Sequence, residues 1–493
     1  MTSVLTTYDP ATEQAIEVFP VHDAASVAEV VDRARVAARW WEDIGAEERR
    51  ARLLAWKGVV VRRLDELAQL VHRENGKPLA DAQLEILACV DHMDWAARNA
   101  ARVLRRRHVR RSLLMINQAA TLEYLPLGVI GVIGPWNFPV FTPMGSIVYA
   151  LAAGNAVVFK PSELTPAVGS WLVRTFGEVV PEQPVLQLVT GDGSTGTALC
   201  RSGVDKIAFT GSTATAKTVM ATCAETLTPV LLECGGKDAL IVDADADLDA
   251  AADQAAWGAF ANAGQACIGI ERAYVHQSVY DAFVERLLAR VTALRPGSDP
   301  QAAYGPLTLA RQASVVREHV ADALGRGGRL RIGSLEGVRD RLAGPIVIED
   351  APEDCLAVTD ETFGPTLTIT RVRDAEEAVD RANASRYGLG GAVFSRTRGV
   401  ELARRMRSGM TAVNSVWSFA FVPGLPFGGV GDSGFGRVHG EDGLREFTRP
   451  KAITRQLFSV PVPLTTFDRK PEHLALVLKA TTLLHGRRPR RRG

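Results

Sequence analysis

The sequence has few cysteines, no surplus of charge and no long apolar run, and each of these absences excludes a class of protein. Six cysteines are scattered over 493 residues without CxxC spacing, so neither a disulfide framework nor a zinc site is indicated, and we expect no metal. The 57 Lys and Arg nearly balance the 56 Asp and Glu, leaving a net charge of +1. This balance gives no overall electrostatic reason to expect a nucleic-acid partner.

Signals for export and for membrane insertion are also missing. The first residues, MTSVLTTYDPATEQ, contain neither a basic stretch nor an apolar core. No uncharged apolar run reaches the roughly 18 residues that a spanning helix needs. We therefore expect a protein of the reducing cytoplasm. With 46% apolar residues and ordinary glycine and proline usage, the chain can fill large cores, roughly two to four domains in extent.

Apolar periodicity divides the chain into a helical opening followed by two α/β series. Residues 24–103 show helical spacing, interrupted by the stop signal Asn75-Gly76-Lys77-Pro78. From Gly128, short β-branched runs (GVIGVIG, NAVVFKP, VLQLVTG, KIAFTG, PVLLECGG) alternate with helical stretches. A second series contains ERAYVH, TLTITRV, GGAVFS and TAVNS. This alternation predicts βαβ units in parallel sheets, with a boundary near Gly235-Gly236.

Two segments differ in composition from the rest. Residues 105–111 (RRRHVRR) are basic and precede one or two predicted strands, and the tail after Phe458 combines LALVLKATTLL with a terminal RRPRRRG. Solvated surface segments are the simpler interpretation of both. The alternative is weak peripheral contact of the basic tail with an anionic membrane or an acidic partner.

Two glycine-containing turns could bind a cofactor phosphate. Residues 191–196 match the spacing of a dinucleotide fingerprint, but the next strand begins only about ten residues later and position 216 is Ala rather than an acid. We interpret this segment as a surface turn. The turn Gly211-Ser212-Thr213 leads from a predicted strand into a predicted helix. Its free backbone amides suit a pyrophosphate, although an ordinary capped helix start would look the same.

A set of motifs then resembles the aldehyde dehydrogenase superfamily in order and spacing, from about Tyr8 to Thr454. These motifs are Pro135-Trp136-Asn137-Phe138-Pro139, Lys160-Pro161-Ser162-Glu163, Leu232-Glu233-Cys234-Gly235-Gly236-Lys237, Asn262-Ala263-Gly264-Gln265-Ala266-Cys267, Glu361-Thr362-Phe363-Gly364-Pro365 and Pro426-Phe427-Gly428-Gly429. The resemblance implies an α/β fold with a Rossmann-like cofactor-binding domain, a second α/β catalytic domain and a small β oligomerisation arm.

The resemblance also implies the catalytic residues. Cys267 would be the nucleophile that forms a thiohemiacetal and then a thioester. Asn137 would stabilise the oxyanion. Glu233 would activate the water that releases a free acid. Considered alone, Glu233 could instead be a buried structural carboxylate beside Lys237. Relatives that pass the acyl group to coenzyme A lack this glutamate, so its presence favours hydrolysis.

Cofactor positions follow in the same way. The resemblance implies Trp136, Gly211 and Ser212 at the pyrophosphate, Lys160 and Glu163 at the adenosine ribose, and Glu361 with Phe363 at the nicotinamide. The Glu163 carboxylate would repel a 2′-phosphate, so we expect NAD, with NADP as the alternative. Three positions differ from residues that are common in the family. Ala216 stands where the phosphate turn often has its second glycine. Ser146 and Val438 stand where many members have a Lys and a Glu that relay a proton.

The implied domain boundaries place residues 1–104 and 126–235 in the cofactor-binding domain and 236–425 in the catalytic domain. Residues 105–125 and 451–460 would form the oligomerisation arm of a homodimer or homotetramer, followed by a tail at 461–493.

The expected substrate is a small-molecule aldehyde with an apolar chain or ring, because the residues near the implied site are mostly apolar. Succinate-semialdehyde enzymes have arginines at the positions of Gly145 and Ala261, and neither is present here. The proposed tunnel wall consists of Phe138, Val140, Phe141, Thr142, Pro143, Met144, Gly145, Ala266, Ile268, Trp417, Phe419, Phe421 and Phe427. Several of these could equally be core residues, and Gly145 should leave room for a long or broad substrate. We expect medium-chain aliphatic or aromatic aldehydes to be the better substrates. The alternatives are a semialdehyde dehydrogenase with other cationic groups, or a non-catalytic binding protein on the same fold.

Overall fold

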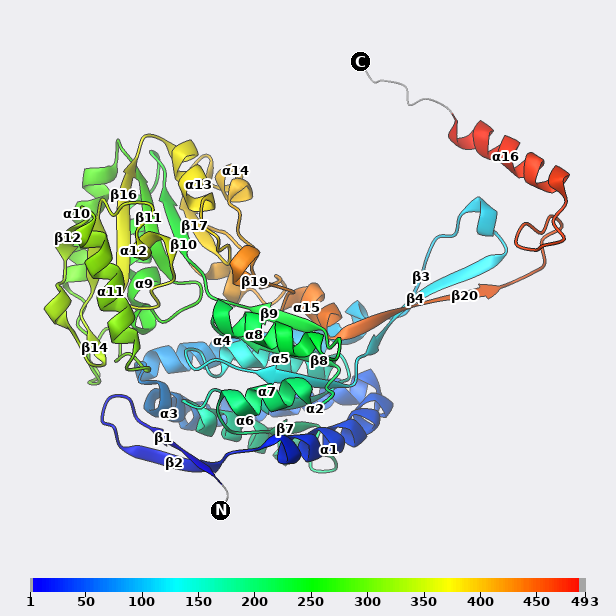
Figure 1. The fold of residues 1–493 in the computed structure, drawn as a ribbon, viewed down its shortest axis with the longest axis horizontal. Coiled ribbons are helices and arrows are strands. Elements are labelled where there is room, and N and C mark those ends of the chain that lie inside the picture. The colour runs from blue at the N-terminus through cyan, green and yellow to red at the C-terminus, as the bar shows by residue number, and fades with distance from the viewer. Residues whose placement is uncertain (1–2, 487–493) are drawn as a thin grey trace. The chain divides into compact units, whose positions relative to one another are not determined.

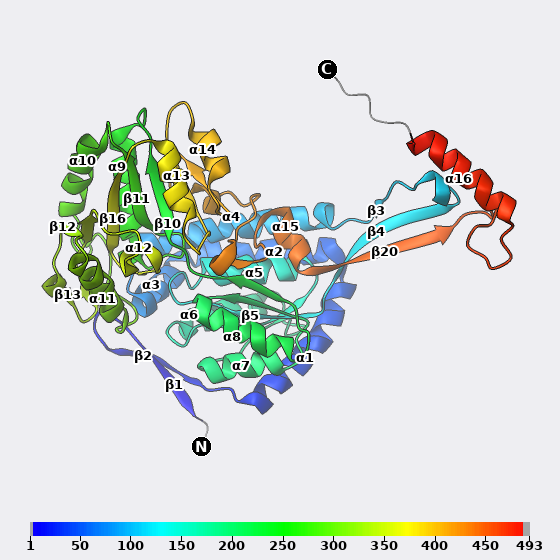
Figure 2. The same cartoon turned by 45° about the horizontal axis from the view of Figure 1, so that its top comes forward.

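The computed structural model describes residues 3–486 and divides the chain into two compact units. The larger unit consists of Met1–Leu104 and Leu125–Arg449, and the smaller one of Arg105–Tyr124 and Pro450–Gly493. Within the larger unit, Figures 1 and 2 show two sheets, each with helices packed around it. The predicted α/β class with parallel sheets is confirmed.

The helical opening forms as the periodicity predicts. It contains α1 (Ala24–Asp43), α2 (Gly45–Arg62), α3 (Leu64–Asn75) and α4 (Leu79–Val103), and is preceded by the hairpin β1 (Val4–Tyr8) and β2 (Ala15–Pro20). The predicted stop ends α3 at Gly76, whose φ is 88°. A side chain there would be strained and would come within 2.9 Å of Pro10 and Pro306.

The first sheet has six strands in the order β19-β9-β8-β5-β6-β7. Its strands are β5 (Val129–Ile133), β6 (Ala156–Lys160), β7 (Leu186–Leu188), β8 (Lys206–Thr210), β9 (Val230–Glu233) and the late β19 (Gly434–Phe435). All pairs are parallel except β19 with β9. The crossover helices are α5 (Phe141–Ala152), α6 (Pro166–Val179), α7 (Gly193–Arg201) and α8 (Thr213–Ala224). The runs of β-branched residues in β5 and β6 are buried throughout, as strands covered on both faces require.

The second sheet has seven strands in the order β12-β15-β16-β11-β10-β17-β18. Its strands are β10 (Asp238–Val242), β11 (Ile270–His276), β12 (Arg329–Ile332), β15 (Ile346–Glu349), β16 (Thr366–Val372), β17 (Gly391–Phe394) and β18 (Ala412–Val413). The accompanying helices are α9 (Leu248–Phe260), α10 (Tyr280–Thr292), α11 (Gln312–Gly325), α12 (Leu356–Thr359), α13 (Ala375–Asn383) and α14 (Gly399–Arg405). Helix α15 (Gly440–Glu446) follows β19 and packs against α4 and α5 instead. A small hairpin, β13 (Val338–Arg339) with β14 (Leu342–Ala343), completes this part. The chain passes from one sheet to the other between Glu233 and Asp238.

The smaller unit contains a three-stranded sheet in the order β20-β4-β3. Its strands are β3 (Arg107–His108), β4 (Gln118–Pro126) and β20 (Thr448–Gln456), and helix α16 (Pro471–His485) follows. The terminal arginines at 487–493 lie outside the described residues, so membrane contact through the basic tail stays a prediction. Between residues 3 and 486, the chain forms no helix that is both long and apolar enough to cross a membrane.

Candidate functional site

The predicted site residues follow the carboxyl ends of neighbouring parallel strands, where α/β folds place ligands. Strand β5 ends at Ile133 and leads to the loop with Trp136 and Asn137, whereas β8 ends at Thr210 and leads to Gly211 and Ser212. Glu233 is the last residue of β9, which pairs with β8. The topology therefore gathers three separate motifs at one edge of the first sheet.

Cys267 arrives at this edge through a strained turn after α9. Asn262, Ala263 and Gly264 have φ values of 52°, 57° and 70°, and a Cβ at Gly264 would lie 2.0 Å from the Gly364 carbonyl oxygen. Left-handed backbone costs a non-glycine residue roughly 1–2 kcal/mol. The strained residues Asn262 and Ala263 lie in the turn that places Cys267 beside the carboxyl ends of the strands.

The Asn137 loop is fixed by residues that the sequence analysis did not single out. The Lys77 ammonium donates to the Asn137 carbonyl at 2.8 Å, and the Asn262 amide donates to the same oxygen at 3.1 Å. Lys77 forms a buried ion pair with Glu85 at 2.5 Å. The other Glu85 oxygen accepts the backbone N–H groups of Val140 at 2.8 Å and Phe141 at 3.0 Å. The ion pair therefore ties α4 to the loop that carries Asn137.

Burial dominates the electrostatics of Glu233. Within residues 3–486, neither carboxylate oxygen has a hydrogen-bond partner of good geometry. Burial raises the pKa of Glu233 from its usual value near 4.5 to about 7, against the opposing effect of the nearby Cys267 and Thr210 side chains. Lys237 pairs with Glu271 and donates to Thr362 at 3.2 Å. The interpretation of Glu233 as a structural partner of Lys237 is therefore not supported.

Burial also raises the pKa of the thiol of Cys267 and of the carboxyl group of Glu361 at this edge. Burial, followed by the Glu233 carboxylate, raises the pKa of the Cys267 thiol well above its usual value. Burial, followed by the nearby Glu271, raises the pKa of Glu361 to about 8. Glu361 accepts the Gly236 N–H at 3.0 Å. A thiol beside a carboxylate of pKa about 7 has a proton acceptor within its own cavity.

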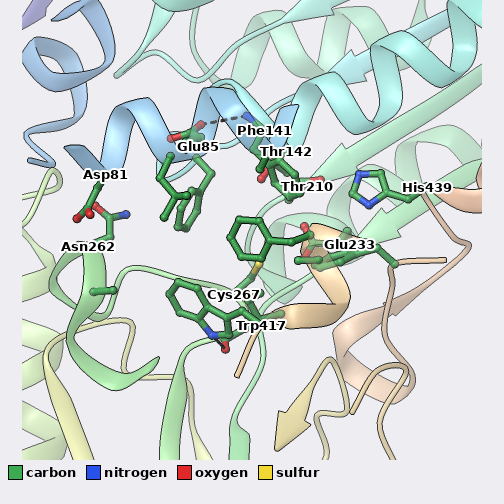
Figure 3. Close-up of a pocket in the computed structure, with 18 of the residues that line it drawn as sticks. Asp81, Glu85, Phe141, Thr142, Thr210, Glu233, Asn262, Cys267, Trp417 and His439 are labelled. Carbon is green, nitrogen blue, oxygen red and sulfur yellow. Dashed lines mark hydrogen bonds between the residues drawn. The ribbon is translucent and has the colours of Figure 1, made fainter. Parts of the chain in front are cut away.

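Two cavities meet at Cys267 and Glu233, and Thr210 also lines both. One cavity is an apolar tunnel and the other a more polar cleft. Figure 3 shows Cys267 and Glu233 on the side of the tunnel that carries Trp417, facing Glu85, Phe141 and Thr142 from α4 and α5. A group in the tunnel and a group in the cleft can therefore both reach Cys267.

The polar cleft contains most of the predicted cofactor residues. Trp136, Gly211, Ser212, Glu361 and Phe363 line it, together with Asn137. Trp136 and Phe363 meet edge to face with ring centroids 5.5 Å apart. Arg311 and Gln312 also line the cleft. They were missed because no motif marks them.

Lys160 and Glu163 lie one strand further along the sheet, at the end of β6, and are not among the residues that line this cleft. The Lys160 ammonium is buried and donates to the Pro161 carbonyl at 3.1 Å, while the Glu163 carboxylate is 4.0 Å away and half exposed. Burial lowers the pKa of Lys160. The segment interpreted as a surface turn, residues 191–196, starts helix α7, with Asp192 capping it by accepting the Ser194 N–H at 2.8 Å.

The tunnel wall contains only part of the predicted set. Phe138, Phe141, Thr142, Ile268, Trp417, Phe421 and Phe427 line the tunnel, whereas Val140, Pro143, Met144, Gly145, Ala266 and Phe419 are not among its lining residues. The expectation that Gly145 leaves room for substrate is wrong. A Cβ at Gly145 would lie 2.5 Å from His439 Nε2, so the imidazole fills that space.

His439 is a polar residue at the inner end of the tunnel, across the cavity from Asp81 in Figure 3. Its ring lies 3.9 Å from that of His92 and is surrounded by Phe141, Tyr149 and Phe427. Burial, followed by His92, lowers the pKa of His439 well below its usual value, which keeps the imidazole neutral. In the described part of the chain, no group of three or more His, Cys, Asp or Glu residues is placed to hold a metal ion.

Comparison with known proteins identifies the family. The model of the aldehyde dehydrogenase family matches residues 2–453. A 4,4′-diapolycopene aldehyde oxidase from Methylomonas sp. is 38% identical over 437 residues, which cover 88% of this chain and 82% of that protein. The crystal structure of an aldehyde dehydrogenase from Burkholderia cenocepacia superimposes with a TM-score of 0.89 at 32% identity, covering 95% of this chain and 96% of that one. PnpE in complex with nicotinamide adenine dinucleotide gives a TM-score of 0.88 at 32% identity over 94% and 96% of the two chains. The chain belongs to the aldehyde dehydrogenase family and is an enzyme that oxidises aldehydes.

Proposed function

We propose that this protein oxidises apolar aldehydes to free carboxylic acids with NAD, through a covalent adduct on Cys267. The observation that carries the proposal is the meeting of the apolar tunnel and the polar cleft at Cys267 and Glu233. A substrate in the tunnel and a cofactor in the cleft would share only that junction.

The first step belongs to Cys267 and Glu233. The thiol proton passes to the Glu233 carboxylate, and the thiolate sulfur attacks the aldehyde carbon. The aldehyde oxygen then becomes an oxyanion. One N–H of the Asn137 amide donates to the Gln265 carbonyl at 3.0 Å. Because the amide has two hydrogens, the second is available to the oxyanion, as is the Cys267 backbone N–H.

The second step is hydrolysis. Loss of two electrons and the aldehyde hydrogen converts the adduct into a thioester on Cys267. Glu233 first releases the thiol proton to solvent. It then takes a proton from a water molecule, whose oxygen attacks the acyl carbon, and the C–S bond breaks to release the acid. The Cys267 thiolate finally takes the proton back from Glu233, which restores the thiol and the carboxylate. The overall balance is aldehyde, water and NAD⁺ to carboxylic acid, NADH and a proton. A carboxylate of pKa about 7 is suited to both proton transfers near neutral pH.

The residues of the polar cleft fit NAD. Ser212 caps α8, and its hydroxyl accepts the Thr215 N–H at 3.3 Å. The first amides of that helix suit a pyrophosphate. Beside it, a Cβ at Gly211 would come within 2.7 Å of the Phe209 ring, so only glycine is accommodated without displacement. Bound NAD would supply the acceptor for the electrons of the aldehyde. The half-exposed Glu163 carboxylate favours NAD over NADP if it reaches the ribose, as the family resemblance implies.

The charges that line the tunnel support an apolar substrate rather than a semialdehyde with a carboxylate. Among its lining residues in the described chain, Lys77 is the one cation apart from the neutral His439, and Glu85 already neutralises it. Asp81 adds an acid, whose pKa burial raises against the effect of Lys77. A substrate carboxylate would therefore enter without a partner. The Methylomonas relative is named as a 4,4′-diapolycopene aldehyde oxidase, and a substrate of the same aldehyde class here agrees with this proposal.

Two variants test the proposal. Cys267→Ala should abolish NADH formation and leave NAD affinity within about twofold, while the matched control Cys200→Ala, at a buried cysteine outside both cavities, should keep its activity. Glu233→Gln should form about one NADH per site, more slowly than the wild type, and then stall, because the thiol can lose its proton to water in place of Glu233, whereas hydrolysis requires the base at Glu233. Stopped-flow absorbance at 340 nm with octanal measures both. Sustained turnover by Cys267→Ala would refute the nucleophile, and wild-type turnover by Glu233→Gln would refute the base.

A further inference from the structure

A second apolar cavity continues the tunnel at its outer end. We call it the outer cleft. It shares Asp81, Leu84, Trp257, Ala261 and Phe421 with the tunnel. Beyond this shared rim, its wall includes the apolar side chains of Ala293, Leu294, Tyr304 and Val422. A molecule that leaves the tunnel at Trp257 and Phe421 therefore enters the outer cleft without leaving the protein surface.

The charged groups of the outer cleft neutralise each other. Asp253 and Arg290 are its charged residues beyond the rim among those described, and their carboxylate and guanidinium are 3.6 Å apart. Arg290 also approaches Asp249 at 3.4 Å. Beyond the rim, the described residues of the cleft thus offer no unpaired charge to an ionic ligand, and the charged residue of the rim, Asp81, is an acid that would disfavour an anion.

The neutral polar groups of the wall are also occupied. The Tyr304 hydroxyl donates to the Ala343 carbonyl at 3.0 Å, which leaves its ring as apolar wall. The Gln254 side-chain oxygen accepts the Val416 N–H at 3.1 Å, and the Ser418 hydroxyl is 2.8 Å from that of Ser415. A ligand would therefore gain mainly from removing its own apolar surface from water.

Large apolar side chains stand exposed at the rim and on the wall. Leu84 is 41% exposed, Phe421 39% and Val422 47%. Such grouped exposure is unfavourable in water, and it is typical of a surface that a ligand covers. The grouping coincides with the point where the tunnel opens.

We propose that the outer cleft is the distal half of the substrate site and binds the chain of long apolar aldehydes whose carbonyl carbon lies at Cys267. This inference rests on the proposed function. It predicts that kcat/KM continues to rise with chain length after the tunnel is full, by up to about fourfold for each further methylene that leaves water. A terminal carboxylate would lose this gain, because it would require desolvation in an apolar cleft that holds no free cation.

The test compares n-alkanals from propanal to dodecanal in the wild type and in two variants at separate segments of the cleft wall, Val422→Asp and Ala293→Asp. Both positions are exposed, so folding should tolerate the change. The matched control is Val400→Asp, at a 57% exposed valine on α14 outside both cavities. Each cleft variant should lower kcat/KM for dodecanal about tenfold or more and leave propanal within twofold. The control should change neither.

Equal effects on propanal and dodecanal, or no effect on either, would overturn the inference. A change in sedimentation coefficient for the cleft variants alone would also overturn it, because the cleft would then hold a second copy of the chain. Failure of the proposed function is distinguishable, since a wild-type chain that oxidised no aldehyde would already fail with propanal.

Discussion

Glu233 occupies a position where ionisation is unfavourable for the fold and necessary for the proposed chemistry. Its carboxylate is 3% exposed and has no hydrogen-bond partner of good geometry in the described chain. A pKa of about 7 in the folded state, against about 4.5 when unfolded, means that the folded chain holds the proton more tightly. Protonation therefore stabilises the fold fully below pH 4.5, and that stabilisation is lost as the pH rises through 7.

Glu233→Gln separates these two consequences. The variant should have the higher Tm at pH 8, by about 1–3 °C, with a smaller difference at pH 5.5, because glutamine carries no charge to desolvate. In the wild type, kcat should rise with pH around a midpoint near 7, and the variant should lack that rise. Differential scanning calorimetry and steady-state rates at both pH values measure this. A Tm difference that is larger at pH 5.5 would show that Glu233 is not the ionising group.

At the level of single residues, the motifs predicted segments that the structure brings to the junction of the tunnel and the polar cleft, and the catalytic roles of these residues stay predictions. The segments of Asn137, Glu233 and Cys267 were recognisable because each motif is continuous in the chain. Lys77 and Glu85 could not be recognised, since their roles depend on contacts with a loop about 60 residues away. Gly145 misled for a related reason: its missing side chain makes room for His439, which lies far along the chain.

At the level of elements, periodicity predicted helices and strands well and their pairing less well. The four opening helices and the β-branched strands follow directly from apolar spacing. Strand β19 pairs with β9 across about 200 residues, and its two residues carry no strand pattern. The hairpin β1–β2 was missed because its side chains are mostly exposed. Alternation of buried and exposed residues is the signal that such strands lack.

Helix α4 illustrates how an element can position a site that it does not contain. Glu85 pairs with the Lys77 ammonium and accepts the backbone N–H groups of Val140 and Phe141 at the start of α5. Lys77 in turn donates to the backbone carbonyl of Asn137, so Glu85 helps to fix the position of Asn137. Glu85→Gln would place an amide against the buried ammonium. We expect kcat to fall about 10–100-fold, because small displacements of an oxyanion donor cost that much.

The measurement must separate positioning from general destabilisation. In Glu85→Gln the dissociation constant for NAD should stay within twofold of the wild type, since the polar cleft is not lined by this pair. Asp91→Asn is the matched control, because it makes the same change at an exposed position of α4. Parallel loss of NAD affinity and kcat in Glu85→Gln would show that the whole site had collapsed. Isothermal titration calorimetry and initial rates distinguish the two outcomes.

At the level of the whole molecule, all residues of the tunnel, the polar cleft and the outer cleft belong to the larger unit. The described residues of the smaller unit line none of these cavities, and several of its apolar side chains are exposed. Val109, Leu114, Met115, Ile116, Leu457 and Phe458 are each at least 45% exposed. The sequence resemblance assigns this segment to oligomerisation, and exposed apolar surface of this kind is what a partner copy would cover.

We predict that the wild type is a homodimer or homotetramer and that the double variant Ile116→Asp/Phe458→Asp is a monomer. The two charges would need to be desolvated in the interface, and charge burial without a partner outweighs the apolar contacts of two side chains. Val400→Asp, on the surface of the larger unit, should leave the assembly intact. Sedimentation velocity gives the mass, and propanal oxidation gives the activity per chain, which should stay within about threefold because the proposed catalytic residues all belong to the larger unit of one chain. A wild-type chain that sediments as a monomer would refute the role of the smaller unit in assembly.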